Sequence, residues 1–449
     1  MAAARNSRLA DLSGALRDFF AARLEFGILS GRRVCVGLSG GRDSVVLLHA
    51  LAGLRDSLSF DLSAFHVHHG LSPHADRWTA FCEEFCASLA VPLRVVRVAV
   101  QETGEGLEAA ARQARYAAFT HCEADWLALA HHQDDQAETL LLNLLRGAGA
   151  EGLAAMPAER RQGDLRLVRP LLGVPRAAIA AWAGAHGLGW VEDESNDDTA
   201  LRRNFLRHEI LPRLNETFTG ATKALANTAG LMGETVVLLD ELAVEDQARV
   251  SAGGVLRLAP FNALSAQRRA NLLRHEIRRQ GLRMPDARYL GEMLRQLAEA
   301  GAESAPRFAL DGGLVAVYRD GLFVVPAIAP GGEAVWQGEP VLPWAGAALS
   351  FTEVIGAGLS RAKLGDAPLQ VRIRAGGETF RTHRARPRRC LKKLFQELGV
   401  PPWWRECLPL LWCGNDLVWV AGLGVAPDYR AAPDEPAVLP AWSALATPV

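Results

Sequence analysis

The chain has 449 residues, of which 49% are hydrophobic and 22% charged, and its formal net charge is −1. This length exceeds one ordinary hydrophobic core and predicts two or three domains. The balanced charge excludes a chain that is basic throughout. The sequence has no run of about 20 apolar residues, so we expect no membrane span. The N-terminal sequence is too polar for a signal peptide, so we expect a cytoplasmic protein.

The first part of the chain, residues 33 to 200, alternates short apolar runs with longer helical patterns. The sequence predicts strands at residues 34–38, 62–67, 93–98 and 126–130. It predicts helices at residues 44–54, 74–90, 105–123 and 135–146. This alternation is typical of a doubly wound parallel sheet covered by helices on both faces, with ligands bound at the carboxyl ends of the strands.

The rest of the chain is predicted in coarser terms. We expect a helix at about 175–187, an acidic turn, and then an Arg-rich helix that ends at Pro212. The pattern is helical throughout from about 216 to 300, residues 302–350 resemble a linker region, and a β-rich domain begins near 350. The predicted domains are an α/β domain, a helical middle domain with its linker, and a β-rich α+β domain, at residues 1–215, 216–345 and 346–449.

The sequence SGGRDS, residues 39–44, lies where the first predicted strand ends and the first helix begins. Its glycines permit a tight turn, and the free N–H groups of a helix N-terminus attract phosphate. Ser39 and Ser44 add hydroxyl donors. The carboxylate of Asp43 is out of place in an anion site unless it holds a cation that accompanies the phosphates, which suits Mg²⁺ with a nucleotide. The alternative is an ordinary turn with incidental glycines.

A second cluster of polar residues, HHQDDQAE, begins at His131. His131 and His132 end a predicted strand, and the acidic residues that follow open a helix. Asp135 and Glu138 are three residues apart and share a face of that helix. Acidic residues in a first turn are also ordinary caps, but this cluster holds more titratable groups than capping needs. Zinc is a weaker alternative to magnesium here, because Mg²⁺ prefers oxygen ligands.

Two further groups of arginines have possible roles. Arg112 and Arg115 lie three apart on a predicted helix, where they would stabilise a polyphosphate leaving group if they face the strand ends. From Arg372 to Arg405 the chain has ten basic residues against two acidic ones, a local net charge of +8. Clustered charge of this kind is a nucleic-acid signature. The simpler interpretation is a solvated face over an ordinary core, in which the interleaved aromatic residues are core residues.

Several of these motifs together resemble those of a known family. SGGRDS resembles the SGGxDS signature of N-type ATP pyrophosphatases, the PP-loop enzymes. The ordered blocks HVHHGLSPHADRW, EAAARQARYAAF, HHQDDQAETLLLNLLRGAGAEGLAAM and EDESNDDTALRRNFLRHEILPRL are similar to those of tRNA(Ile)-lysidine synthetases. The C-terminal sequence LKKLFQELGVPPWWRECLPLLW is similar to the final domain of the same family.

The resemblance implies a reaction in which free lysine is joined to the wobble cytidine of a tRNA(Ile) with a CAU anticodon. ATP would adenylate the 2-oxo group of the cytidine and release pyrophosphate, and the lysine amine would then displace AMP. ATP and Mg²⁺ are the implied cofactors, and the implied domains are a PP-loop catalytic domain, the helical middle domain and a C-terminal tRNA-binding domain.

The resemblance also implies roles for individual residues. The implied ATP-binding residues are Ser39, Gly40, Gly41, Arg42, Asp43 and Ser44. The implied catalytic residues are Asp43, which would hold the magnesium, Arg112, His132 and Asp135. Either His132 or Asp135 would act as the base, and Glu138 would orient His132 or bind the lysine ammonium, while Arg115 is a further candidate. Acceptor-stem phosphates would contact Arg384, Arg386, Arg388, Arg389, Lys392 and Lys393.

The main alternative is another PP-loop enzyme that modifies tRNA, a thiolase. Thiolases of this group use reactive or cluster-bound cysteines. The seven cysteines here include no pair with C-x-x-C spacing. Cys82 and Cys86, four apart on a predicted helix, are interpreted as small buried residues. A tRNA-binding protein without catalysis is disfavoured because Asp43 and the His-Asp-Asp cluster are both present.

Overall fold

The computed structural model describes residues 2–23, 31–100, 107–194, 198–301, 304–329, 331–365 and 367–443. The chain divides into two compact units, residues 1–238 and 239–449. Among the described residues, no helix combines the length and apolar character needed to cross a membrane. The three-domain division made from the sequence stays a prediction.

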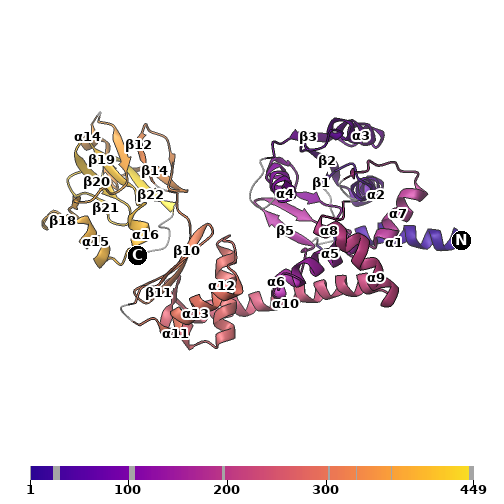
Figure 1. Cartoon of the computed structure of the whole chain (residues 1–449). Helices are drawn as coiled ribbons and strands as arrows, with labels where there is room; N and C mark the ends of the chain where they lie inside the picture. The colour runs from indigo at the N-terminus through magenta and orange to yellow at the C-terminus, as the bar shows by residue number, and fades with distance from the viewer. Residues whose placement is uncertain are drawn as a thin grey trace. The chain divides into compact units, whose positions relative to one another are not determined.

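Unit 1 is built on a sheet of six strands in the order β3-β2-β1-β4-β6-β5 (Figure 1). All neighbours pair in parallel except β5 with β6. The strands are β1 (Arg33–Gly37), β2 (Asp61–His68), β3 (Leu93–Arg97), β4 (Trp126–Ala128), β5 (Glu159–Gln162) and β6 (Leu165–Val168). The predicted doubly wound sheet is confirmed, and the hairpin β5–β6 was not predicted.

The helices of unit 1 cover both faces of this sheet. They are α1 (Ala2–Ala21), α2 (Arg42–Leu58), α3 (Ala75–Ser88), α4 (Leu107–Ala118), α5 (Gln133–Leu144), α6 (Ala150–Leu153), α7 (Arg176–Ala185), α8 (Arg202–Phe205) and α9 (Leu211–Thr217). Helices α1, α2, α3 and α7 share one core with β1 and β4, in which Leu16, Leu51 and Ile179 are fully buried. On the opposite face, Ala118 and Phe119 pack on Phe65 and Leu127.

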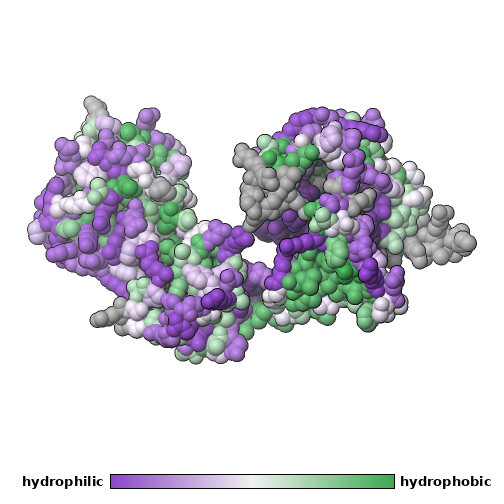
Figure 2. Space-filling model, in the orientation of Figure 1, coloured by the Kyte–Doolittle hydropathy of each residue, from purple (hydrophilic) through white to green (hydrophobic). Residues whose placement is uncertain are grey.

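The Arg-rich segment of unit 1 does not end at Pro212 as predicted. Helix α8 continues through a π-helical turn, Leu206–Ile210, into α9. Pro212 lies at the start of α9, directly after this π-helical turn, and π-turns inside helices are sites where the regular hydrogen-bond pattern is interrupted. A long helix, α10 (Ala221–Val250), follows. Figure 2 shows apolar residues gathered on the face of unit 1 that carries α6 and α10.

The middle of the chain combines helices with a sheet. Helices α11 (Leu258–Ala263), α12 (Ala266–Arg279) and α13 (Ala287–Glu299) pack on a five-stranded sheet, and Phe261, Leu273 and Met293 are fully buried between them. Its strands are β7 (Ser251–Ala252), β8 (Val255–Arg257), β9 (Arg307–Leu310), β10 (Gly313–Tyr318) and β11 (Gly321–Pro326). The helical middle is confirmed, although β7 and β8 interrupt a segment that was predicted to be helical throughout. Residues 307–326 form strands where the sequence predicted linker.

The C-terminal part is rich in strands, as predicted. One sheet has the order β12-β16-β19-β20-β21 and a second has the order β13-β14-β22-β15. The strands and helices are β12 (Glu333–Trp336), β13 (Val341–Trp344), β14 (Ala347–Ile355), β15 (Leu359–Ser360), α14 (Arg361–Leu364), β16 (Leu369–Arg372), β17 (Thr379–Phe380), β18 (Arg389–Cys390), α15 (Leu391–Glu397), α16 (Pro402–Arg405), β19 (Leu410–Cys413), β20 (Asp416–Val420), β21 (Gly424–Val425) and β22 (Pro436–Trp442).

Candidate active site

The strand order of unit 1 reverses between β1 and β4, and polar side chains gather at the carboxyl ends of these two strands. Such a reversal leaves a crevice in which α/β proteins bind ligands. The loop that contains SGGRDS follows β1, and His131 and His132 follow β4. The structure therefore brings together the two motifs that the sequence analysis singled out.

The loop after β1 is shaped to receive phosphate. Gly40 has φ +85°, and a Cβ there would lie 2.8 Å from a methyl group of Val191. The hydroxyl oxygens of Ser39 and Ser44 are 3.1 Å apart, and the N–H of Gly41 donates to Ser39 Oγ at 3.3 Å. No side chain caps the N-terminus of α2, so its first N–H groups stay available to an anion.

Asp43 connects this loop to the end of β4. Its Oδ1 accepts hydrogen bonds from Nε and Nη2 of Arg42, both at 3.1 Å, and its Oδ2 lies 3.5 Å from Nε2 of His132. Burial alone would raise the pKa of Asp43, but His132 and Arg42 together lower it below its ordinary value. Asp43 is therefore ionised at neutral pH and lies at the reversal point of the sheet.

His132 caps α5 and is almost completely buried. The N–H of Asp135 donates to Nδ1 of His132 at 3.4 Å, and the N–H of His132 donates to Oδ2 of Asp135 at 3.0 Å. Because Nδ1 accepts, the neutral ring carries its proton on Nε2, which faces Asp43. Burial lowers the pKa of His132, but Asp43, Asp135 and Asp134 raise it above its ordinary value.

Asp135 and Glu138 form a buried cluster with two arginines. Nε of Arg203 donates to Glu138 at 2.7 Å and its Nη2 donates to Asp135 at 2.9 Å. Arg207 makes the corresponding contacts at 2.7 and 3.2 Å. Burial would raise the pKa of Asp135, but His132 and Arg203 lower it to about 2. The Glu138 carboxylate contacts these arginines, and no hydrogen bond joins it to His132 among the described contacts.

Sequence reasoning missed Arg203 and Arg207 as site residues. Both lie in the Arg-rich segment that was identified only as a helix, one on α8 and one on the π-helical turn. Their spacing of four residues was the available signal, because it places two guanidinium groups on one helical face. Asp134 instead has a structural contact, since its carboxylate accepts the backbone N–H of Arg176 at the start of α7.

The arginines of α4 lie outside the hydrogen-bonded cluster. Arg112 is exposed and its Nη2 donates to the hydroxyl of Tyr116 at 3.4 Å. Arg112 nevertheless lies close enough to help lower the pKa of His131. Burial and the nearby arginines bring this pKa to about 3. Burial and the positive charge of Arg115 lower the pKa of His69 to about 4. Both histidines are therefore neutral at physiological pH.

The C-terminal basic residues lie on the surface. Arg384, Arg386, Lys392 and Lys393 are exposed, with no ion-pair partner among the described residues. Arg389 pairs with Glu397, and Arg388 lies 3.9 Å from Asp416. The interleaved Phe380, Phe395 and Trp403 are buried in hydrophobic clusters, as the simpler interpretation predicted.

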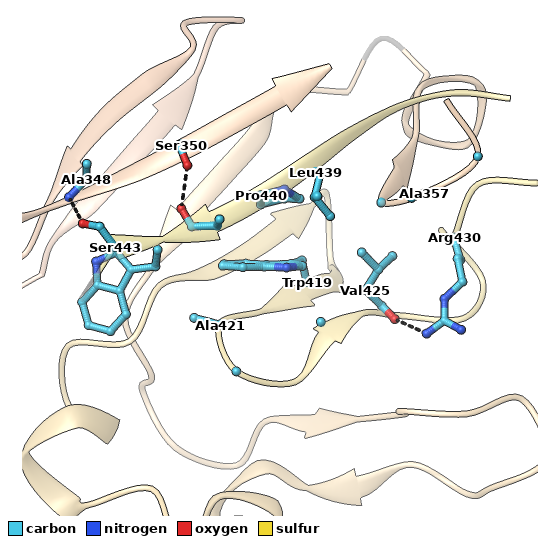
Figure 3. A pocket seen from close by; sticks show the side chains of 16 residues that line it. Ala348, Ser350, Ala357, Trp419, Ala421, Val425, Arg430, Leu439, Pro440 and Ser443 are labelled. Atoms are coloured by element: carbon cyan, nitrogen blue, oxygen red, sulfur yellow. Dashed lines mark hydrogen bonds between the residues drawn. The ribbon is translucent and has the colours of Figure 1, made fainter. Parts of the chain in front are cut away.

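A separate cavity of about 720 Å³ lies among the C-terminal strands (Figure 3). Glycines, alanines and other apolar residues dominate its lining, and Arg430 is its charged side chain. Trp419 and Pro440 lie against the middle of the cavity (Figure 3). Because the lining holds no carboxylate or histidine, it offers no acid–base chemistry, and the candidate active site is the one in unit 1.

Comparison with known proteins matches three parts of the chain to domain families. Residues 14–214 match the PP-loop domain, residues 256–323 the TilS substrate binding domain, and residues 369–442 the TilS substrate C-terminal domain. A tRNA(Ile)-lysidine synthase of Nitrosomonas europaea is 42% identical over 439 residues, which are 95% of each chain. A protein of the same name from Aromatoleum aromaticum is 44% identical over 92% of this chain and 97% of its own. The chain belongs to the tRNA(Ile)-lysidine synthase family.

Proposed function

We propose that this protein joins free L-lysine to the wobble cytidine of a tRNA(Ile) with a CAU anticodon, using ATP. The cytidine 2-oxo oxygen attacks the α-phosphorus of ATP, and the bond to pyrophosphate breaks. The lysine amine then attacks C2 of the cytidine, loses a proton, and displaces AMP. The observation that supports this reaction most strongly is the cluster of Asp43, His132 and Asp135 beside a phosphate-binding loop, in a chain of this family.

The PP-loop domain uses ATP, and the loop after β1 is its binding site in this proposal. Ser39, Gly41 and Ser44 bind the pyrophosphate through hydroxyl and N–H groups, Gly40 permits the turn, and Arg42 adds a positive charge. A magnesium ion fits Asp43, because Mg²⁺ is commonly held by one or two carboxylates together with substrate phosphates. Bound there, the ion would neutralise phosphate charge. No cluster of three acidic, histidine or cysteine ligands exists among the described residues, and this mode of binding needs none.

His132 is the better of the two proposed bases. An efficient base has a pKa near the working pH. The pKa of Asp135 is about 2, so its carboxylate has little tendency to take a proton. The raised pKa of His132 suits it to accept the proton that the lysine amine loses. To do so, Nδ1 must first release the N–H of Asp135, while the N–H of His132 still donates to the Asp135 carboxylate.

The remaining charged groups position the substrates. Arg203 and Arg207 fix Asp135 and Glu138, and Arg112 would offset negative charge on the leaving pyrophosphate. Glu138 is a candidate ligand for the lysine ammonium, which would require it to exchange an arginine contact. Acceptor-stem phosphates of the tRNA would contact the surface residues Arg384, Arg386, Arg388, Arg389, Lys392 and Lys393.

The thiolase alternative is not favoured. The curated relatives are named tRNA(Ile)-lysidine synthase. Burial raises the pKa of Cys82 to about 12 and of Cys86 to about 11, which disfavours a reactive thiol at these two positions. Both are buried small residues, as predicted. Because tRNA and free lysine meet in the cytoplasm, that compartment remains part of the proposal.

The test is to incubate the protein with ATP, labelled lysine and transcripts of tRNA(Ile) and tRNA(Met) that share the CAU anticodon. We expect lysine to be incorporated into tRNA(Ile) only, with AMP and pyrophosphate released in equal amounts. Incorporation into both transcripts, or pyrophosphate release that leaves the tRNA unmodified in the presence of lysine, would contradict the proposal.

A further inference from the structure

Three guanidinium groups surround the side chain of Tyr116 on α4. The Cζ atoms of Arg112 and Arg160 lie 5.0 and 4.5 Å from the centre of the Tyr116 ring. The Tyr116 hydroxyl accepts a hydrogen bond from Arg112 and is also hydrogen-bonded to Arg169. We refer to Arg112, Tyr116, Arg160 and Arg169 as the arginine cage.

Among the described residues, no carboxylate compensates the positive charge of the arginine cage. In the part of the chain that the structure describes, none of its arginines forms an ion pair. The nearest acidic residue in sequence, Glu159, lies within salt-bridge distance of Arg23 and Arg166. Arg169 is only 2% exposed, and its Nε has no hydrogen-bond partner. Like charges held together in this way repel one another, which favours binding of an anion between them.

The arginine cage lies at the same edge of the sheet as the active site. Arg169 directly follows β6, which pairs in parallel with β4, and β4 leads to His131 and His132. Burial lowers the pKa of Arg169, and Arg160 and Arg112 lower it further. Arg112 and Arg160 are both exposed, so an anion can reach the cage from solvent. The buried Arg169 adds a third positive charge to the cage.

We propose that the arginine cage binds a backbone phosphate of the tRNA anticodon loop beside the reacting cytidine. This inference rests on the proposed function. A phosphodiester carries a negative charge and no cation. Free lysine carries an α-ammonium group one carbon from its carboxylate, and the three guanidinium groups would repel that ammonium. The phosphates of ATP have their own site in the loop after β1, two strands away from β6. Arg112 is also proposed to offset the leaving pyrophosphate, so Arg160, which has no such role, is the cage residue that reports on the tRNA phosphate.

The test compares two arginines that are neighbours on β5. Arg160 faces Tyr116, and Arg161 points to the other face, because side chains alternate along a strand. The full-length variants Arg160→Gln and Arg161→Gln are titrated with the anticodon stem-loop RNA of tRNA(Ile) at several salt concentrations. We expect Arg160→Gln to weaken binding about two- to fivefold and to flatten the salt slope by about 0.7 to 0.9, and Arg161→Gln to do neither.

Two outcomes would overturn the inference. One is that Arg160→Gln and Arg161→Gln bind the hairpin with the same affinity and salt slope. The other is that Arg160→Gln leaves hairpin binding unchanged but raises the KM for lysine at saturating tRNA, which would assign the cage to the lysine carboxylate. The proposed function is tested separately, because wild-type protein that binds the hairpin but forms no lysidine would contradict the function and leave the cage intact.

Discussion

The active-site edge of unit 1 and the basic segment from Arg384 to Lys393 are both rich in charge, and they use it differently. At the edge, Glu138 and Asp135 are buried and each contacts two guanidinium groups. In the basic segment, Arg384 and Arg386 are exposed and have no ion-pair partner among the described residues. Buried pairs hold side chains in one geometry, whereas exposed cations are screened by salt and remain available to a polyanion.

This contrast in burial suits the two regions to different functions. Catalysis needs groups with fixed positions and shifted pKa values, and burial provides both. Binding of a nucleic-acid backbone needs positive charge that counterions can leave. The arginine cage is intermediate, because Arg169 is buried like the active-site groups while Arg112 and Arg160 are exposed.

The largest expected effect comes from Asp43→Asn. This change removes the negative charge at the reversal point of the sheet and preserves the size of the side chain. We expect pyrophosphate release to fall about a thousandfold, the scale of losing one electrostatic contact in a transition state. Affinity for tRNA, measured by filter binding, should stay within about twofold, since an exposed binding surface is unaffected. Turnover near the wild-type rate would remove Asp43 from the mechanism.

His132→Gln tests the proposed base and should lower the rate of lysine transfer about a hundredfold. Because the pKa of His132 lies above its ordinary 6.5, the proton-accepting form increases as pH rises through that higher value. The wild-type rate should therefore rise over this pH range, and the variant should lose this dependence. A rise that persists in His132→Gln would show that another group titrates.

The same pKa shift has a consequence for stability with a definite sign. A raised folded-state pKa stabilises the fold below pH 6.5, and this contribution is lost as pH rises through the folded-state value. Asp135 behaves in the opposite way, since its contribution is present above pH 3.8 and is lost as pH falls towards 2. Unfolding by urea at a series of pH values measures both contributions. His132→Gln should remove the first and reduce the second, because His132 also lowers the pKa of Asp135.

Glu138→Gln separates buried charge from exposed charge. The change leaves Arg203 and Arg207 facing a neutral amide in a buried cluster, which costs about 3–5 kcal/mol of folding free energy and lowers Tm by about 6 to 20 °C. The control is Glu194→Gln. Glu194 is exposed, and its Oε1 lies 3.4 Å from Nε2 of the surface residue His74. Equal melting temperatures for the two variants would contradict the importance of the buried cluster.

The smallest expected effect comes from the basic segment. Replacing Arg384 and Arg386 together with Gln should flatten the salt slope of tRNA binding by about one to two units, using the slope per phosphate of duplex DNA as a guide. Replacing Arg389 should change the slope less, because its guanidinium already pairs with Glu397. If Arg389→Gln has the larger effect, the pairing with Glu397 does not persist when tRNA binds.

The sequence predicted the parallel sheet and placed Asp43 and His132 each at the end of a strand. It did not predict that the two side chains face each other, which follows from the neighbouring positions of β1 and β4 in the sheet. It could not predict the partners of Glu138, since Arg203 is 65 residues away in the chain and only the tertiary fold joins them. The strands between residues 307 and 326 were mistaken for linker because their glycines and prolines are also typical of loops. Arg169 followed a strand, β6, that the sequence analysis did not identify.

The most direct test of the contrast between the two regions is the single-turnover rate of pyrophosphate release as tRNA concentration is raised. The comparison is between Asp43→Asn and the double variant of Arg384 and Arg386. Our prediction is that the double variant needs more tRNA but reaches the wild-type rate at saturation, and that Asp43→Asn saturates at the wild-type tRNA concentration with a rate near zero. A double variant that stays slow at saturating tRNA, or an Asp43→Asn rate restored by more tRNA, would contradict it.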